Sequence, residues 1–434
     1  MDRPLKLGLA GLGTVGASLA RLVKDRQELY ARRAGRPIEI VAVSARDRMK
    51  DRGVDLSAIE WFDDPVALAE KADIDVFVEL VGGSDGAAYD SVKAALGRGL
   101  TVVTANKALL AHHGVQLARL AQKKNAAILF EAAVAGGIPI IKTMREALRG
   151  NATSRVYGIL NGTCNYMLTR MEKEGIAFED CLADAQRLGY AEADPTFDIG
   201  GFDAAHKLAV LTSLAFGCEI DLDSIFIEGI DQVSNADIEA AAELGFRIKL
   251  LAVAQRTETG IEQRVHPTMI PASSALAQID GVTNAVAVDT DLLGSILLAG
   301  PGAGGEATAS AVLSDVIDAA GSARVPPLGL PANELAPYKR ARMRAHEGGY
   351  YIRLSVLDQV GAFASIARRM AENGISLESI VQRRRDQTDD GATRPVVLIT
   401  HETTEAAVRK ALEHVSRDGH LRGEPRMIRI EALN

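Results

Sequence analysis

The sequence feature that most limits the fold is a glycine-rich run, Gly-Leu-Gly-Thr-Val-Gly, at residues 11–16. It follows the short apolar stretch LKLGLA at residues 5–10 and precedes a long pattern of helical periodicity. A G-x-G-x-x-G run is a weak signal alone. Between a strand and a helix it is typical of dinucleotide binding, because the helix N-terminus then faces the pyrophosphate. The alternative is a tight turn without a ligand. The run predicts five cofactor contacts: Gly11, Gly13, Thr14, Val15 and Gly16.

Apolar stretches alternate with helical patterns as far as residue 134. The stretches 38–45, 74–80, 100–106 and 126–134 are largely apolar at consecutive positions, so both faces of these predicted strands are buried. Helical patterns lie between them. This order predicts an α/β fold with a Rossmann-type, doubly wound parallel sheet that carries helices on both faces.

The pattern changes after this point. Residues 137–300 mix longer helices with strands and predict a separate α+β domain. A second glycine loop opens a helix at residues 300–322, and the Pro- and Arg-rich stretch 323–348 predicts a linker. Residues 350–434 have the βαββαβ order of a ferredoxin-like unit.

Charge and cysteine content exclude several classes of protein. The chain has 49 Lys and Arg against 57 Asp and Glu, a net charge of −8, so we expect no nucleic-acid partner bound through its phosphates. No apolar run reaches the roughly 18 residues of a membrane span, so we expect no membrane association. The three cysteines, Cys164, Cys181 and Cys218, have neither metal-ligand nor CxxC spacing, which favours a reducing, cytoplasmic compartment.

The residues after the second predicted strand bear on the choice of dinucleotide. An acidic side chain there holds the ribose hydroxyls of NAD, whereas an arginine pairs with the 2′-phosphate of NADP. Arg46 and Asp47 are neighbours at this point. The sequence therefore leaves NADP and NAD open, and it also leaves open that Arg46 is an ordinary surface residue.

The stretch AQRLGYAEADPTFDIGGFDAAHK at residues 185–207 collects charges in a segment that Gly and Pro interrupt. Asp203 and Lys207 are four residues apart and share one face of a predicted helix. An ordinary surface ion pair is the alternative, but strongly apolar residues follow Lys207. The helix is therefore predicted to be buried, and buried charges need partners or a chemical task. A second lysine, Lys107, follows the predicted strand 100–106, at the edge where open α/β sheets bind ligands.

Together these motifs resemble those of the homoserine dehydrogenases. The stretch 185–207 matches the signature of that family in full, and further matching motifs occur in the expected order at residues 11–16, 104–107, 131–139, 161–166 and 300–304. Residues 350–434 resemble an ACT domain. The resemblance implies the three-domain bacterial form of the enzyme. Its NAD(P)-binding domain would be residues 1–134 with about 305–340, its substrate-binding and dimerisation domain 135–304, and its ACT regulatory domain 350–434.

The resemblance implies NAD(P)-dependent interconversion of L-aspartate 4-semialdehyde and L-homoserine, on the way to threonine, isoleucine and methionine. It implies Lys207 as the proton donor, with Lys107 and Asp203 as further catalytic residues. Lys107 and Gly302 would also contact the cofactor. The implied substrate contacts are Tyr190, Glu192, Asp198 and Asp203.

The resemblance also implies a monovalent cation, commonly sodium, bound mostly by backbone carbonyls. The matching positions are Glu131, Val134, Gly136 and Ile138. The alternative is a glycine turn that leads into the second domain and binds nothing.

The ACT-like unit implies an amino-acid effector, for which threonine is the natural candidate, and the resemblance implies a homodimer or homotetramer. Asp358, Gly361 and Asn373 are the candidate regulatory residues. The alternative is a unit that serves only oligomerisation.

The sequence leaves two other functions open. A semialdehyde dehydrogenase would use a thiolate nucleophile, for which Cys164 is the candidate in its polar stretch Asn-Gly-Thr-Cys-Asn. A non-catalytic amino-acid sensor would bind a cofactor without turnover, and the presence of Lys107, Asp203 and Lys207 together argues against it.

Overall fold

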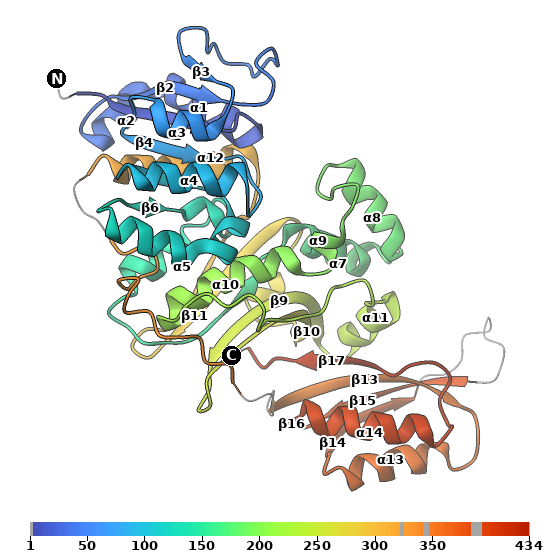
Figure 1. Cartoon of the computed structure of the whole chain (residues 1–434). Coiled ribbons are helices and arrows are strands. Elements are labelled where there is room, and N and C mark those ends of the chain that lie inside the picture. Colours follow the sequence, from blue (N-terminus) through green and yellow to red (C-terminus); the bar gives the residue numbers. More distant parts are fainter. Residues whose placement is uncertain (1–2, 322–324, 342–346, 383–392, 434) are drawn as a thin grey trace.

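The computed structural model describes residues 3–321, 325–341, 347–382 and 393–433 (Figure 1). The N-terminal part contains a six-stranded sheet in the order β3-β2-β1-β4-β5-β6, in which every pair of neighbours is parallel. The strands are β1 (Leu5–Ala10), β2 (Ile38–Ser44), β3 (Glu60–Phe62), β4 (Val76–Glu79), β5 (Thr101–Thr104) and β6 (Ile128–Leu129). The predicted doubly wound parallel sheet is confirmed.

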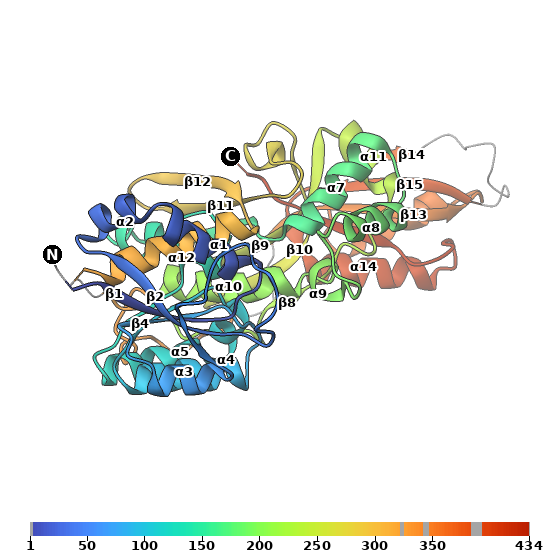
Figure 2. The same cartoon turned by 90° about the horizontal axis from the view of Figure 1, so that it is seen from above.

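Helices cover both faces of this sheet (Figure 2). One face carries α3 (Pro65–Lys71), α4 (Ala87–Gly97) and α5 (Lys107–Lys123). The other carries α1 (Thr14–Asp25), α2 (Gln27–Ala34) and α12 (Gly305–Ala319). The last of these returns from far along the chain and packs so closely on α1 that a Cβ at Gly305 would lie 2.9 Å from the Ser18 hydroxyl.

The second sheet begins in the middle of the chain. Its order is β12-β11-β7-β9-β10-β17-β13-β15-β14, with β8 paired to β10 and β16 to β13. The strands of the middle part are β7 (Thr153–Ile159), β8 (Phe226–Ile227), β9 (Phe246–Arg256), β10 (Ile261–Pro271), β11 (Thr283–Thr290) and β12 (Gly294–Pro301).

The helices of the middle part are α6 (Ile140–Lys142), α7 (Gly162–Glu174), α8 (Phe178–Arg187), α9 (Thr196–Ile199), α10 (Phe202–Phe216) and α11 (Asn235–Glu243). Short turns are η1 (Glu131–Ala133), η2 (Thr143–Ala147) and η3 (Leu276–Gln278). The central helix α10 packs against α5 of the first domain and against the second sheet, so most of its residues are buried, Asp203 and Lys207 included.

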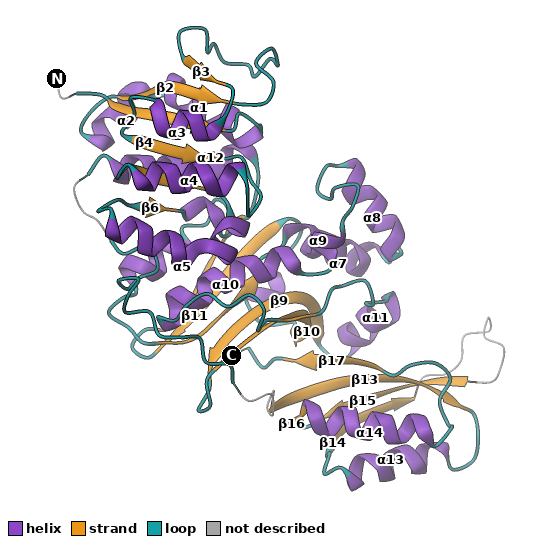
Figure 3. Cartoon of the chain, viewed as in Figure 1, coloured by secondary structure: helices purple, strands orange, loops and turns teal. Residues whose placement is uncertain are grey.

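The C-terminal unit has the predicted βαββαβ order. It consists of β13 (Glu347–Leu357), α13 (Ala362–Glu372), β14 (Leu377–Gln382), β15 (Thr393–Thr400), β16 (Thr403–Thr404), α14 (Glu405–Arg417) and β17 (Arg426–Ile430). Figure 3 shows α13 and α14 on the same face of its strands. Because β17 also pairs in parallel with β10, at Thr268–Arg429 and Met269–Ile430, one sheet runs through the middle domain and this unit.

The prediction of a linker at residues 323–348 is wrong for residues 325–341, the part of it that the structure describes. Ala336 pairs with Cys218: its N–H donates to the Gly217 carbonyl, and its carbonyl accepts from the Glu219 N–H. The Tyr338 hydroxyl donates to the Ile261 carbonyl at 2.9 Å. The segment is a strap that packs on the middle domain and also contacts α5, where the Ala332 N–H donates to the Gln122 side chain at 2.9 Å. The prolines of this segment indicate that it has no regular helix or central strand. They do not prevent an extended backbone from pairing at the edge of a neighbouring element.

Candidate active site

The carboxylate of Asp203 lies between two lysines. Its Oδ1 is 3.1 Å from the Lys107 Nζ, and its Oδ2 accepts a hydrogen bond from the Lys207 Nζ at 2.7 Å. Burial opposes ionisation of Asp203, but the two ammonium groups outweigh it and hold the pKa of Asp203 well below its usual range. The structure thus brings together the three side chains predicted to be catalytic, from α5 of one domain and α10 of the next.

Asn161, the N-cap of α7, organises this cluster, and sequence reasoning gave it no role. Its Nδ2 donates to Asp198 at 2.8 Å and to Asp203 at 3.0 Å, while its Oδ1 accepts from the Cys164 backbone. The preceding carbonyl, of Leu160, accepts from Lys207 at 2.7 Å and from Asn284 at 3.0 Å. An asparagine before Gly-Thr after a predicted strand is an N-cap signal that marks such a position.

Lys107 is placed by a network at the ends of β4 and β5. The buried Glu79 carboxylate accepts from the Thr104 hydroxyl at 2.6 Å, and Asn106 caps α5 by accepting from the Leu109 backbone. Lys107 is therefore the first residue of α5, and its side chain remains about one-third exposed, at 34%. It is the part of the cluster that faces solvent.

Three further residues predicted to bind substrate differ in exposure, and one of them, Asp198, is linked to the cluster. Asp198, on α9, is half-buried, and burial raises its pKa. Glu192 is exposed, and its backbone carbonyl accepts from Gln186. Tyr190 is exposed as well, with its ring 5.0 Å from that of Tyr166. The structure joins Asp198 to Asp203 through Asn161, and it places Glu192 and Tyr190 on the preceding loop.

The glycine run has the geometry that a dinucleotide needs. Gly11 has a φ of +98° and a Cβ there would lie 2.4 Å from the Leu80 carbonyl, while a Cβ at Gly16 would lie 2.1 Å from the Gly11 carbonyl. Gly13 has nothing within 4 Å of its Cβ position, and it caps α1 with Thr14 exposed beside it. The outer glycines therefore close the turn, and the middle of the run leaves an open helix N-terminus that fits a pyrophosphate.

Basic residues follow β2. Arg46 is exposed there, and the Arg52 guanidinium reaches back to the Leu12 carbonyl in the glycine run at 3.2 Å. Arg48 and Arg52 both lie over the Trp61 ring, at 5.5 Å.

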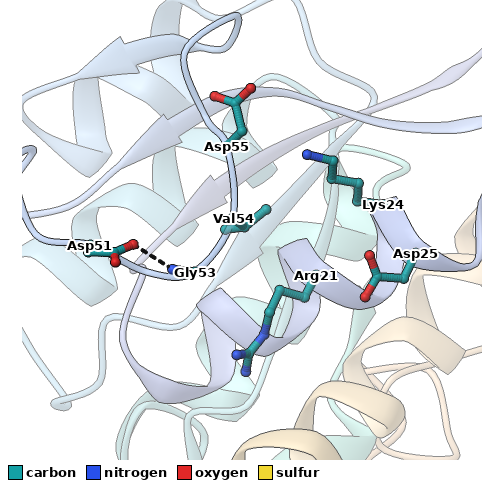
Figure 4. A pocket seen from close by; sticks show the side chains of 7 residues that line it. All are labelled: Arg21, Lys24, Asp25, Asp51, Gly53, Val54 and Asp55. Carbon is teal, nitrogen blue, oxygen red and sulfur yellow. Dashed lines mark hydrogen bonds between the residues drawn. The ribbon is translucent and has the colours of Figure 1, made fainter.

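An adjacent groove opens between α1 and residues 51–55 and is lined by Arg21, Lys24, Asp25, Asp51, Gly53, Val54 and Asp55 (Figure 4). Sequence reasoning considered Arg46 and missed Arg52, because only the folded chain brings Arg52 to the glycine run.

Gly302 packs against protein. It is buried, and a Cβ there would lie 2.1 Å from the Asn284 side chain. Its carbonyl lies against Gly136, where a Cβ would approach to 2.4 Å. Gly302 thus fixes the turn at residues 131–138 against the end of β12.

That turn is buried and sharply bent, with consecutive positive φ values at Ala135 (56°) and Gly136 (53°). The Glu131 carboxylate accepts from the backbone N–H groups of Ile141 and Lys142, each at 2.8 Å. Its side chain is therefore occupied. A cation at Glu131, Val134, Gly136 and Ile138 would depend on backbone carbonyls, and the bent backbone fits that donor set. Within the described residues no group of three or more His, Cys, Asp or Glu side chains is arranged to hold a metal.

Cys164 does not have the environment of a nucleophile. It is fully buried, and its thiol donates to the Asp198 carbonyl at 3.2 Å. Burial, together with Asp198 and Asp203, raises its pKa well above the ordinary value, so the reactive thiolate is disfavoured. The alternative that used Cys164 as a nucleophile is not favoured.

The regulatory candidates lie at opposite ends of one helix. Asp358, which forms an ion pair with Arg394 at 2.8 Å, and Gly361, with a φ of +91°, lie at the start of α13. Asn373 is its C-cap and donates to the Arg369 carbonyl. Eleven helical residues separate the two ends, about 16 Å. The structure therefore does not bring the three together within one chain.

Within the described part of the chain, no helix is long and apolar enough to span a membrane.

Known proteins similar to this chain are homoserine dehydrogenases, and the similarity extends over its whole length. Residues 139–317 match the family model of homoserine dehydrogenase, residues 11–131 match its NAD-binding domain, and residues 350–416 match the ACT domain. The homoserine dehydrogenases of Neisseria gonorrhoeae and Pseudomonas aeruginosa are each 42% identical, over the full length of both chains.

Solved structures agree with these matches. A crystal structure of a homoserine dehydrogenase from Thiobacillus denitrificans has a TM-score of 0.93 and 41% identity, covering 100% of this chain and 99% of that one. A hyperthermophilic archaeal homoserine dehydrogenase in complex with NADPH has a TM-score of 0.63 and 29% identity, covering 73% of this chain and 98% of that one.

Proposed function

The chain belongs to the homoserine dehydrogenase family, and we propose which of its residues carry the NAD(P)-dependent interconversion of L-homoserine and L-aspartate 4-semialdehyde. The observation that carries the proposal is the buried carboxylate of Asp203, shared by Lys107 and Lys207. The bound nicotinamide supplies or accepts the hydride. The protein must supply the proton path and hold the substrate.

Lys207 is the proton donor and acceptor at the substrate oxygen. Its Nζ is oriented by Asp203 and by the Leu160 carbonyl, which leaves the third N–H of the ammonium for the substrate. Lys107 adds positive charge at the exposed edge of the site. Its ammonium group also balances the negative charge of Asp203 whenever Lys207 has given up its proton.

The substrate is an amino acid, so its ammonium group needs carboxylates. Asp198 supplies one near the cluster, and Glu192 and Tyr190 on the loop before it close over the ligand. Asn161 keeps Asp198 and Asp203 together.

Lys207→Ala tests this assignment. Asp203 keeps Lys107 and Asn161 as partners, so the variant should fold and bind the dinucleotide, whereas turnover of homoserine should fall about a hundredfold, as it does on loss of a general acid. Turnover near that of the wild type in a folded variant would remove Lys207 from the mechanism.

NADP is the proposed cofactor, with NAD as the weaker one. The support is the basic segment after β2, where Arg46 is exposed and Arg52 reaches the glycine run. Arg46→Ala should raise KM for NADP about tenfold and leave KM for NAD nearly unchanged, because only NADP carries a 2′-phosphate. Equal effects on both would make Arg46 a surface residue.

We also propose a monovalent cation, with sodium as the candidate, at the buried turn 131–138, an amino-acid effector such as threonine for the ACT unit, and a homodimer or homotetramer. Support for assembly comes from apolar side chains exposed at and before the edge strand β12, namely Leu292 (73%), Leu293 (59%) and Leu297 (37%). The proposed setting is threonine, isoleucine and methionine biosynthesis in the cytoplasm.

A further inference from the structure

The ACT unit contacts the segment that packs against residues 198–203, which are here called the substrate loop because they carry Asp198 and Asp203. Two arginines of β17, Arg426 and Arg429, each approach the Glu228 carboxylate to 3.5 Å. The Arg429 guanidinium also lies over the Phe226 ring, with its carbon 4.7 Å from the ring centre. Arg429 is held within its own unit by Glu405 at 2.6 Å, so it links the two parts rather than belonging to either alone. Residues 226–230 are here called the bridging segment.

The bridging segment is fixed to the middle domain on one side. Phe226 and Ile227 pair with Arg264 and Val265 of β10, and the Glu228 N–H donates to the Val265 carbonyl at 2.8 Å. The same strand β10 pairs with β17 of the ACT unit. A change in the position of β17 therefore acts on this segment through the sheet and through the arginine–Glu228 contacts.

On its other side the bridging segment is packed against residues 199–201. The Ile230 N–H donates to the Ile199 carbonyl at 2.9 Å. A Cβ on Gly229 would lie 2.4 Å from that carbonyl and 2.8 Å from the Gly200 Cα. Protein packing at this density transmits displacement instead of absorbing it. Residues 199–201 are the connection between Asp198 and Asp203.

We propose that Glu228 is a positioning residue through which the ACT unit sets the place of the substrate loop. It touches no reacting atom. Its contact with Arg426 and Arg429 holds the bridging segment, and the bridging segment holds the backbone between Asp198 and Asp203. The proposal rests on the assignment of Asp198 to the substrate, and it deepens the proposed function by adding a route for regulation.

A role confined to the position of Asp198 predicts a change in substrate KM with little change in kcat, because the Leu160 carbonyl and Asn161 hold Lys207 and Asp203 from outside the bridging segment. Gly229→Ala should raise KM for homoserine about tenfold. Gly150→Ala is the matched control, because a Cβ there has nothing within 4 Å and the residue has no positive φ. If Gly229→Ala has the same melting temperature as Gly150→Ala and an unchanged KM for homoserine, the proposed link between the bridging segment and the substrate loop is wrong.

The arginine link is tested by a double-mutant cycle with Glu228→Gln and Arg426→Gln in the full chain. Each single variant should raise KM for homoserine about threefold to fivefold, the range expected for a partly exposed ion pair, and the double variant should be no worse than either single one. Glu219→Gln is the control, because its partner Arg119 lies on α5. Additive effects, or an unchanged KM in Glu228→Gln, would overturn the proposal.

Asp198→Asn separates this proposal from the one on which it rests. A raised KM in Asp198→Asn with an unchanged KM in Gly229→Ala and Glu228→Gln would contradict only the positioning role. An unchanged KM in Asp198→Asn would contradict the substrate assignment itself.

Discussion

Two buried clusters of lysine and aspartate lie one turn apart along α7, and only one of them has the form of a catalytic site. Asn161 at the start of the helix joins Asp203 to Asp198, and Asp203 holds Lys107 and Lys207. Asn165, four residues later, accepts from Lys249 at 3.1 Å. We call these the Asp203 cluster and the Asp280 cluster.

The Asp280 cluster is closed by protein groups. Lys249 is 1% exposed, and it donates to the Ile279 carbonyl at 2.6 Å with Asp280 at 3.4 Å. Asp280 also pairs with Arg247 at 2.8 Å and with Lys173 at 2.7 Å. The Asn165 amide donates to three carbonyls of the connection after η3: Ile279, Gly281 and Thr283.

The two clusters differ in which of their charged groups faces solvent. In the Asp203 cluster the aspartate is buried and one lysine, Lys107, is open to solvent, so a ligand has somewhere to enter. In the Asp280 cluster the lysine is sealed and the aspartate is the outer group. We therefore propose that similar residue types with opposite burial serve turnover in the Asp203 cluster and anchor a strand connection in the Asp280 cluster.

We expect Lys249 of the Asp280 cluster to make the stability of the protein depend on pH. Burial, with Arg247 nearby, lowers the pKa of Lys249 to about 8, so the folded chain releases a proton that the unfolded chain keeps up to about pH 10.4. Between these values the unfolded state binds more protons, so stability due to Lys249 rises with pH. Relative to Lys249→Met, the wild type should gain about 2 kcal/mol in free energy of unfolding between pH 7 and pH 10.

Urea denaturation of both proteins at the two pH values measures this gain, because other titrations cancel in the difference. A difference that stays constant with pH would mean that Lys249 is not a buried, strained cation. The two clusters would then not differ in the way described.

A smaller effect concerns Cys164, which lies beside the Asp203 cluster. Its thiol donates to the Asp198 carbonyl, and a serine hydroxyl can do the same. Cys164→Ser should therefore keep kcat for homoserine within about threefold of the wild type, whereas loss of a nucleophile costs many orders of magnitude. Abolished turnover in the folded variant would restore the thiolate mechanism.

The sequence predicted the parts of the site that depend on local spacing. Asp203 and Lys207 are four residues apart on a helix, and the glycine run lies between a strand and a helix, so periodicity finds both. Lys107 was found from its place after a strand, but its contact with Asp203, 96 residues away, follows only from the packing of α5 on α10.

Contacts that join distant segments escaped prediction. Nothing local relates Lys249 to Asp280, or Arg52 to Leu12, because each pair is brought together by strand and loop geometry. The strap at 325–341 and the pairing of β17 with β10 were missed for the same reason. Pairing at a sheet edge depends on both backbones, so it cannot be predicted from the sequence of one segment alone.

The most direct test of the comparison is kcat for homoserine in Asp203→Asn and Asp280→Asn, measured side by side with the same change of charge and shape. In Asp203→Asn, kcat should fall about a hundredfold or more, because Lys107 and Lys207 lose the carboxylate that orients them. The Asp280 variant should stay within about threefold of the wild type. Equal losses in the two variants, or near-normal turnover in Asp203→Asn, would contradict the assignment of catalysis to the Asp203 cluster.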